Sequence, residues 1–375
     1  MTTMKFTCEK AILNEAIGKA LRAVSSKSTI SALEGILFEA KSRLSLTGYD
    51  LEIGIRTVCD ADIIERGSVI LNAQLIASIV RKLPDNIVTI STDEETFYTT
   101  ISCGSAVFNL LGQDPGTYPE VPTVFGEKSA MIPQNILKSM IQGTIFAVSD
   151  NENKPIITGC LFKIIGNTLT VVALDNYRLA IRKENVTRKE GQEDMSFVVP
   201  GKTLREVERF LDESDEIVNI SLSRRHITYE MKGTVLTSRL LEGEYINYDS
   251  AIPKEYTQKF TVKTDEMISS LDRVSLVVSE KLKSSIRCSF SSDLVKLSCT
   301  TAIGKAYDEC AICMTEGNGL EIGFNSRYLL DALRACKEEE VICTLNTPLT
   351  PCLIHPTEGD KFLYMVLPVR IKAGE

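Results

Sequence analysis

The chain has 375 residues, of which 43% are hydrophobic and 25% are charged, as in an ordinary globular protein. Its net charge of −8 argues mildly against a nucleic-acid partner, and no apolar run reaches the roughly 18 residues that span a membrane. The N-terminus lacks an apolar signal core and the eleven cysteines are scattered, so we expect a cytoplasmic protein with reduced thiols.

The first predicted elements return twice along the chain. A short strand at 6–8 leads into an amphipathic helix that closes on the sequence Ala-Val-Ser at 23–25. The same order follows the strands predicted at 131–133 and 260–262, closing at 147–149 and 277–279. The copies are spaced by about 125 to 130 residues, too long for a solenoid repeat of roughly 20–50 residues. The pattern therefore predicts a whole small domain in three copies.

Each copy continues with alternating runs, predicted as antiparallel strands, and then with a second helix. Leu204, Val207 and Leu211 have the spacing of one buried helical face. We predict an α+β protein of three tandem copies, each with two helices packed on antiparallel sheets. Polar, proline-marked linkers near 119–127 and 253–257 place the predicted domains at 1–125, 128–253 and 256–375.

Lysines and arginines recur on the predicted helices. If the copies continue edge to edge, the helices line one concave surface. On the residues alone these cations are more simply solvated helix faces, by about three to one over DNA contact. They include Lys10, Lys19, Arg81, Lys82, Lys138, Lys202, Arg205, Arg209, Arg273 and Arg334.

Candidate catalytic motifs are incomplete. Lys202 follows a Pro-Gly pair at a strand–helix junction, but Ser196 stands where a phosphate-binding loop needs glycine. Cys310 and Cys313 form a lone C-x-x-C, for which buried core thiols are the simpler reading. Two histidines without motifs supply no triad. We therefore expect neither catalysis nor a metal or other cofactor.

Two stretches carry a family resemblance: ALDNYRLA at 173–180 and YMVLPVRI at 364–371. With the threefold plan and the segment 146–159, they resemble the bacterial DNA polymerase III beta subunit, the DNA sliding clamp. The resemblance implies a head-to-tail homodimeric ring, of which one chain is half. Helices would line the hole, duplex DNA would pass through without sequence readout, and the clamp would tether the replicative polymerase. Such a protein is cytoplasmic and associated with the nucleoid.

The resemblance also implies an apolar pocket between the second and third domains. It would bind short linear peptides of the DNA polymerase III catalytic subunit, the clamp loader, other polymerases and repair proteins. Asn176-Tyr177 and Ser250 depart from the family's usual residues, and the tail 372–375 extends near the pocket mouth. The implied walls are Ile157, Leu174, Asn176, Tyr177, Arg178, Leu179, Ile246, Tyr248, Ala251, Leu349, Leu367, Pro368, Val369 and Arg370.

For DNA contact the resemblance favours Lys27 and Lys154, joined on the helices by Arg81, Lys82, Lys202 and Arg205. At the dimer seam, Phe108 and Leu110 would face Val277 and Val278. Two alternatives stay open: a peptide-binding scaffold that does not tether DNA, and an enzyme with a cleft between repeated domains.

Overall fold

The computed structural model describes residues 3–25, 27–124, 128–188, 191, 193–278 and 285–371. Residues 125–127 of the predicted first linker, Ser279 and the tail 372–375 lie outside the described residues. The chain forms two compact units. The first contains residues 1–132 and 216–240, and the second contains 133–215 and 241–375.

The first unit has two antiparallel sheets and two helices, α1 and α2, which pack on each other and on strands of both sheets. One sheet has the order β5-β1-β7-β8-β9, and the other has the order β10-β15-β16-β17-β4-β3-β2-β6. The elements of the first copy are β1 (Thr3–Glu9), α1 (Lys10–Leu21), β2 (Gly35–Ala40), β3 (Leu44–Tyr49), β4 (Ile53–Cys59), β5 (Asp62–Glu65), β6 (Gly67–Asn72), α2 (Ala73–Lys82), β7 (Ile87–Asp93), β8 (Tyr98–Cys103) and β9 (Ala106–Leu111).

The second copy contributes to both units. Its last three strands, β15–β17, belong to the first unit, whereas its helices α3 and α4 belong to the second. Its elements are β10 (Lys128–Pro133), α3 (Gln134–Gln142), β11 (Gly159–Ile165), β12 (Thr168–Leu174), β13 (Arg178–Asn185), β14 (Met195–Pro200), α4 (Gly201–Phe210), β15 (Ile217–Leu222), β16 (His226–Met231) and β17 (Thr234–Arg239).

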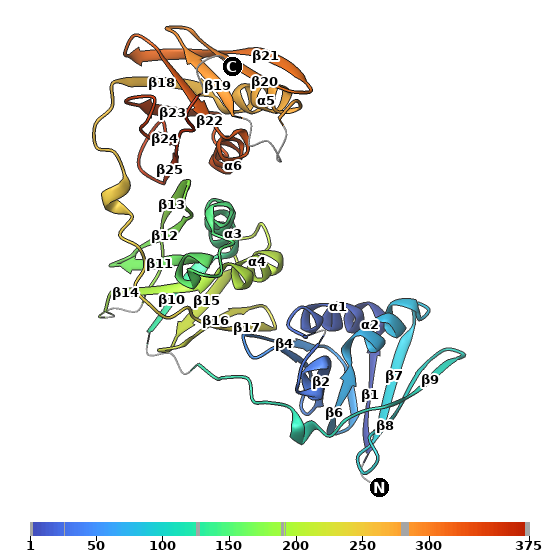
Figure 1. Ribbon diagram of the computed structural model, residues 1–375. Coiled ribbons are helices and arrows are strands. Elements are labelled where there is room, and N and C mark those ends of the chain that lie inside the picture. Colours follow the sequence, from blue (N-terminus) through green and yellow to red (C-terminus); the bar gives the residue numbers. More distant parts are fainter. Residues whose placement is uncertain are drawn as a thin grey trace. The chain divides into compact units, whose positions relative to one another are not determined.

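The second unit is built on one continuous sheet of twelve strands, in the order β14-β11-β12-β13-β25-β24-β23-β18-β21-β20-β19-β22. Figure 1 shows α3 and α6 beside each other along this sheet. The third copy supplies β18 (Gln258–Lys263), α5 (Thr264–Ser275), β19 (Ile286–Phe290), β20 (Leu294–Thr301), β21 (Gly304–Glu316), β22 (Leu320–Phe324), α6 (Ser326–Cys336), β23 (Glu340–Leu345), β24 (Cys352–Pro356) and β25 (Phe362–Val366).

The predicted helices and their buried faces are confirmed. Leu204, Val207 and Leu211 are all buried. The second helices of the first and third copies each begin at an asparagine cap. The side chain of Asn72 accepts a hydrogen bond from the Leu75 amide at 3.0 Å, and that of Asn325 accepts one from Arg327. Such caps satisfy backbone donors that the first helical turn leaves free.

The same join between neighbouring copies occurs once in each unit. In the first unit β4 pairs antiparallel with β17, the last strand of the second copy. In the second unit β13 pairs with β25, the last strand of the third copy. Strand pairing thus carries each sheet from one copy into the next. Two strands that hold the corresponding positions have no such partner in the described chain. They are β9, the last strand of the first copy, and β21, whose residues 304–311 are paired on one side only.

Ten of the eleven cysteines are buried as expected, but the prediction of a buried core thiol is wrong for Cys313. Cys310 is buried whereas Cys313, three residues along the same strand, is exposed, and no disulfide forms among the described residues. The described part of the chain also holds no group of side chains suited to a metal ion. None of its helices is long and apolar enough to cross a membrane.

Candidate functional site

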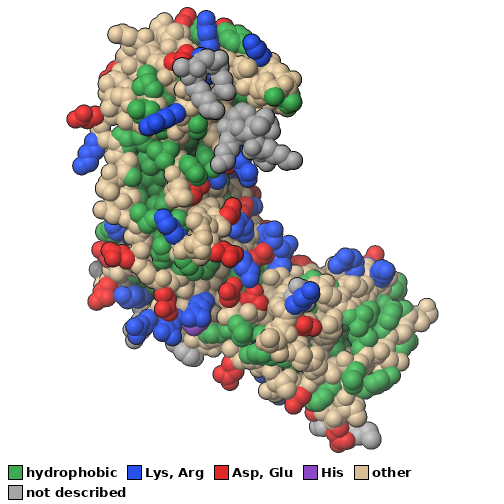
Figure 2. All heavy atoms as spheres, in the orientation of Figure 1, with side chains coloured by type: hydrophobic (Ala, Val, Ile, Leu, Met, Phe, Trp, Pro, Cys, Tyr) green, Lys and Arg blue, Asp and Glu red, His purple; other side chains and the backbone are tan. Residues whose placement is uncertain are grey.

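An apolar face of the twelve-stranded sheet holds the first candidate site. Leu174 and Leu179 face each other across the β12–β13 hairpin, and Met365 lies beside Leu179 on β25. Ile157 and Tyr248 pack against the same cluster. Tyr245 anchors the connecting segment to this face, because its hydroxyl donates to the carbonyl oxygens of Gly159 and Val172 at 3.4 Å. Figure 2 shows hydrophobic side chains gathered over the region labelled β13, β24 and β25 in Figure 1.

Arg178 locks one end of this face. Its Nε lies 3.1 Å from Asp175 and its terminal nitrogen lies 2.5 Å from Asp331 on α6. The guanidinium also covers the ring of Tyr328 at 4.5 Å, and Tyr177 stacks on that ring. Only 10% of the Arg178 side chain is exposed. Two of its guanidinium nitrogens are therefore paired within the protein, and Arg178 holds the hairpin loop against α6.

The predicted pocket residues divide into two groups. Ile157, Leu174 and Leu179 are buried in the apolar cluster, with Tyr248 partly buried against it. Leu367 is tied to the same loop, since its amide donates to the Tyr177 carbonyl at 2.9 Å. The remaining residues are partly or largely exposed and lie outside the cluster: Asn176, Ile246, Ala251, Leu349, Pro368, Val369 and Arg370.

Sequence reasoning missed Met365, Asp331 and Tyr328. Met365 could have been found, because it alternates with Leu367 along the same strand ending and so faces the same side. Asp331 and Tyr328 lie on α6, about 150 residues beyond Arg178. No local sequence pattern predicts a contact between residues that far apart in the chain. Burial raises the pKa of the Tyr328 hydroxyl, with the nearby Asp175 carboxylate adding to the effect.

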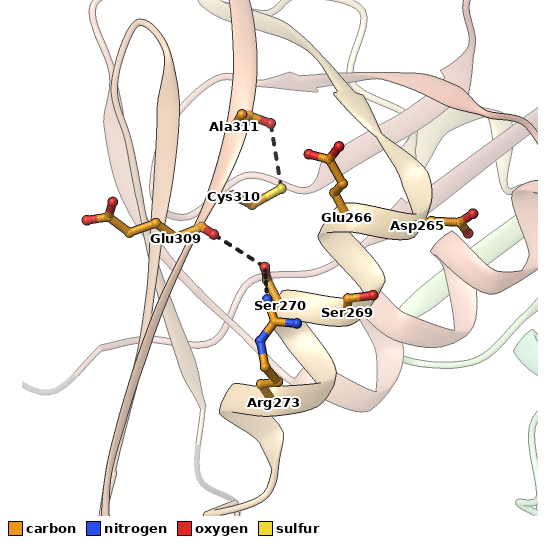
Figure 3. Close-up of a pocket in the computed structure, with 8 residues that line it drawn as sticks. All are labelled: Asp265, Glu266, Ser269, Ser270, Arg273, Glu309, Cys310 and Ala311. Carbon is orange, nitrogen blue, oxygen red and sulfur yellow. Dashed lines mark hydrogen bonds between the residues drawn. The ribbon is translucent and has the colours of Figure 1, made fainter.

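The second candidate surface is the unpaired edge of β21. A hollow of about 320 Å³ lies between this edge and α5 (Figure 3). Ser270 donates to the carbonyl oxygen of Glu309 at 3.4 Å, and Arg273 donates to Ser270 at 3.0 Å. Arg273 also pairs with Asp308 at 2.6 Å and lowers the pKa of that carboxyl. This edge therefore carries an exposed ion pair beside open backbone groups.

Two of the predicted dimer residues, Phe108 and Leu110, lie on the edge strand β9, and the other two, Val277 and Val278, follow α5. On β9 Phe108 is 38% exposed, and its neighbours Val107 and Leu111 are more so. Val277 follows α5 and lies near Gly304, the first residue of β21, while Leu276 is 82% exposed. Val278 is half-buried beside them, and Leu110 is half-buried on β9. Exposed apolar side chains at open sheet edges favour association with another chain.

The predicted DNA-contacting cations differ from other helical cations in their pairing. Lys10, Lys19 and Lys138 each pair with a carboxylate within 3.0 Å. Of the six predicted cations, five are exposed and make no ion pair within the described residues: Lys27, Arg81, Lys82, Lys154 and Arg205. Lys202 is exposed at the start of α4 and does have an interaction partner. Five of the six predicted residues are therefore positive charges that no described carboxylate compensates.

Comparison with known families identifies the chain. Residues 4–122, 131–247 and 249–370 match the N-terminal, central and C-terminal domain models of the DNA polymerase III beta subunit. The chain belongs to the DNA polymerase III beta subunit family. Membership confirms the predicted sliding clamp, a non-catalytic processivity factor of DNA replication, and removes the alternative of a cleft enzyme.

Relatives of the beta subunit family match along the whole chain. The chain is 35% identical to a beta sliding clamp of Halalkalibacterium halodurans, covering 98% of this chain and 100% of the relative. A beta subunit structure from Eubacterium rectale has a TM-score of 0.92 at 38% identity, covering 98% of this chain and 99% of that one. The DNA polymerase sliding clamp of Bacillus subtilis has a TM-score of 0.94 at 33% identity, covering 99% and 100%.

Proposed function

We propose that two copies of the chain close head to tail into a ring around duplex DNA. Within the chain, a hairpin strand of one copy pairs twice with the last strand of the next copy: β4 with β17, and β13 with β25. The same rule applied to the two unpaired edges joins β9 of one protomer to β21 of the other. Each chain has one edge of each kind, so a twofold axis satisfies both. This repeated join is the observation that supports the proposal.

The internal joins also specify the register of the seam. Leu236 lies opposite Ile55 in the first join, and Tyr364 lies opposite Ala180 in the second. One further backbone hydrogen bond lies at the end of each join. In the first unit the Val58 amide donates to the Gly233 carbonyl at 2.7 Å, and in the second unit the Lys183 amide donates to the Lys361 carbonyl at 2.8 Å. The two joins therefore share one register.

Phe108 holds the place of Tyr364 in its own sheet. A cross-strand row runs from Phe6 to Phe108 in the first copy, as one runs from Phe260 to Tyr364 in the third. By the same tracing, Ala306 on β21 holds the place of Ala180. We therefore expect Phe108 of one protomer opposite Ala306 of the other, which places Val107 opposite Tyr307.

A pair of engineered cysteines tests this register. Val107→Cys and Tyr307→Cys in one chain should form an intermolecular disulfide on mild oxidation, because directly opposite Cβ atoms lie about 4.5–5.5 Å apart. The matched control pairs Val107→Cys with Glu309→Cys, a diagonal position about 7–8 Å away. Light scattering should give twice the chain mass of 41.5 kDa. A monomer at micromolar concentration, or cross-linking that favours the control, contradicts the closed ring.

DNA would be held by charge and topology together. Lysines and arginines without carboxylate partners are free to neutralise phosphates, and such contacts carry no sequence information. This explains how an acidic chain serves on DNA: the net charge of −8 describes the whole surface, not the cations that face the duplex.

Retention on nicked circular DNA tests the cation assignment. We would replace five cations together with alanine: Lys27, Arg81, Lys82, Lys154 and Arg205. The variant should stay on circular DNA for a shorter time. Its retention should also depend less on salt, with the slope of log affinity against log salt concentration falling by about 0.9 for each phosphate that is no longer neutralised. The matched control neutralises the already paired Lys10, Lys19 and Lys138. Equal lifetimes for the two variants would remove the assignment. Peptide binding without any retention of the wild-type ring would favour the peptide scaffold instead.

The apolar face of the second unit would serve as the peptide pocket. Buried leucines offer an apolar floor, and the exposed Tyr177, Ile246 and Leu349 offer walls that a peptide can cover. A groove of apolar anchors with few polar groups is a common mode of peptide recognition. The occupants would be linear segments of the replicative polymerase, the clamp loader, other polymerases and repair proteins. We place the protein in the cytoplasm, at the nucleoid.

A further inference from the structure

A second hollow lies on the same face of the sheet as the proposed peptide pocket. It has a volume of about 500 Å³ and is formed by β11, β12, β13, the β24–β25 hairpin and the connecting segment at 248–252. Tyr248 lines this hollow and also packs on the apolar cluster of the pocket. The pocket and the hollow thus occupy two stretches of one face that share Tyr248.

The floor of the hollow continues the pocket row by row. The pocket end carries Leu179 and Met365, and the next outward-facing row carries Ile181 and Leu363. The row after that runs from Lys163 across Thr170 to Lys183. Alternate residues of a strand are about 6.7 Å apart, so the lysine row lies about 13 Å from the pocket row.

The hollow combines apolar surface with an uncompensated charge. Ile165 at its rim is 52% exposed. Lys183 pairs with Asp360 at 2.5 Å, whereas Lys163 makes no ion pair within the described part of the chain. Burial lowers the pKa of His355, so this ring contributes no charge near neutral pH. Two carboxylates line the hollow, Asp249 on the connecting segment and Asp360, the partner of Lys183.

The other copies lack this combination. The positions of Lys163 and Ile165 correspond in the first copy to Glu39 and Lys41, whose charges pair with each other at 2.6 Å. In the third copy they correspond to serines in the register of β19 and the turn that follows it. The exposed isoleucine and the unpaired lysine therefore do not come from the repeat. They occur only in the copy that also carries the proposed pocket.

We infer that this hollow binds the flank of a pocket-bound partner segment, through an apolar side chain followed by a carboxylate. The inference rests on the proposed peptide pocket. The apolar side chain would cover the exposed Ile165, and the carboxylate would pair with the ammonium of Lys163. Four extended residues reach at most about 14 Å, which matches the distance from the pocket row to the lysine row.

Synthetic extensions of a pocket-binding peptide test the inference. The starting probe is the shortest peptide of the polymerase III catalytic subunit that binds the chain. It is extended at either end by Gly-Gly-Leu-Glu, with Gly-Gly-Leu-Lys and four glycines as controls. At one end, the Leu-Glu version should bind about fivefold more tightly than the all-glycine version. This gain is smaller than the full free energy of burying a leucine, because ordering the flank costs entropy.

Variants of the chain locate the gain. Ile165→Asp should remove it, and Lys163→Glu should transfer it to the Leu-Lys peptide, while both leave binding of the unextended peptide within about twofold of wild type. Circular dichroism melts check that each variant is folded. If neither extension improves binding, or if the gain survives both variants, the inference is wrong. If no peptide of the catalytic subunit binds at all, the proposed pocket itself fails, which is a separate outcome.

Discussion

The two joins between copies have one architecture and different surfaces. In each, an aspartate begins the hairpin loop and accepts two backbone hydrogen bonds: Asp50 from 52 and 53, and Asp175 from 177 and 178. In each, a tyrosine of the following linker donates to a strand carbonyl: Tyr118 to Thr47 at 3.1 Å, and Tyr245 to Val172 at 3.4 Å.

The difference lies in what covers the strand after the loop. In the first join Gly54 occupies the position of Leu179, and the linker's own Val121 lies directly over it. A Cβ built on Gly54 would come within 2.6 Å of the valine side chain. In the second join Leu179 fills that position and is buried in an apolar cluster, against which Tyr248 and Ile252 of the linker pack. The first join therefore fills this position with a valine of its own linker, whereas the second fills it with a strand leucine that belongs to the proposed peptide pocket.

Replacing Arg178 with alanine should have the largest effect on stability. The change leaves Asp175 and Asp331 facing each other with no cation between them, and breaking a buried ion pair in this way costs about 3 kcal/mol. The first join holds Ile53 at this position and depends on no such charge. Urea unfolding of Arg178→Ala measures the loss.

Lys183→Ala is the matched control for Arg178→Ala. Its pair with Asp360 is largely exposed, and such pairs contribute at most about 1 kcal/mol. Equal losses for the two variants would show that Arg178 does not lock the loop to α6.

Exchanging the covering residues should affect the two joins in opposite ways. Leu179→Ala should cost about 2–3 kcal/mol of unfolding free energy and weaken binding of a pocket peptide about tenfold, because it opens the apolar floor. Gly54→Leu should cost about 1–3 kcal/mol by overpacking against Val121 and leave peptide binding unchanged. Val121→Ala in the Gly54→Leu background should recover part of that loss. If Gly54→Leu changed the peptide affinity and Leu179→Ala did not, the pocket would have been assigned to the wrong join.

Local patterns predicted the elements of this fold but not its joins. Periodicity located α2, α4 and α6, because each has one apolar stripe; α2 and α6 also begin at an asparagine cap, whereas α4 has no side-chain cap. The division into two units cuts through the second copy, since β15–β17 continue the sheet of the first copy. Pairing between strands about 180 residues apart leaves no signal in a single sequence, so the repeat could suggest a join without showing which edges meet.

The candidate site was predictable only where a local motif passes through it. The hairpin loop at Asp175 and the ending at Leu367 carry recognisable motifs, and both contribute to one face. Tyr328 and Asp331 could not be predicted, because their role depends on how α6 packs on the loop. The second hollow depends in the same way on where the connecting segment leaves the sheet.

Proton uptake should give the smallest effect and can separate the two units. Each unit has one histidine with a lowered pKa: His226 through burial and then Arg239 and Arg225, and His355 mainly through burial. A lowered folded-state pKa means that the unfolded chain binds more protons, so stability falls as pH drops from about 7 toward 5. His226→Gln and His355→Gln should each flatten part of this slope. Raising salt to about 1 M should weaken the His226 contribution more than that of His355, because two arginines act on His226 and only Lys259 acts on His355, while burial is unchanged. A salt response at His355 equal to that at His226 would contradict this assignment of causes.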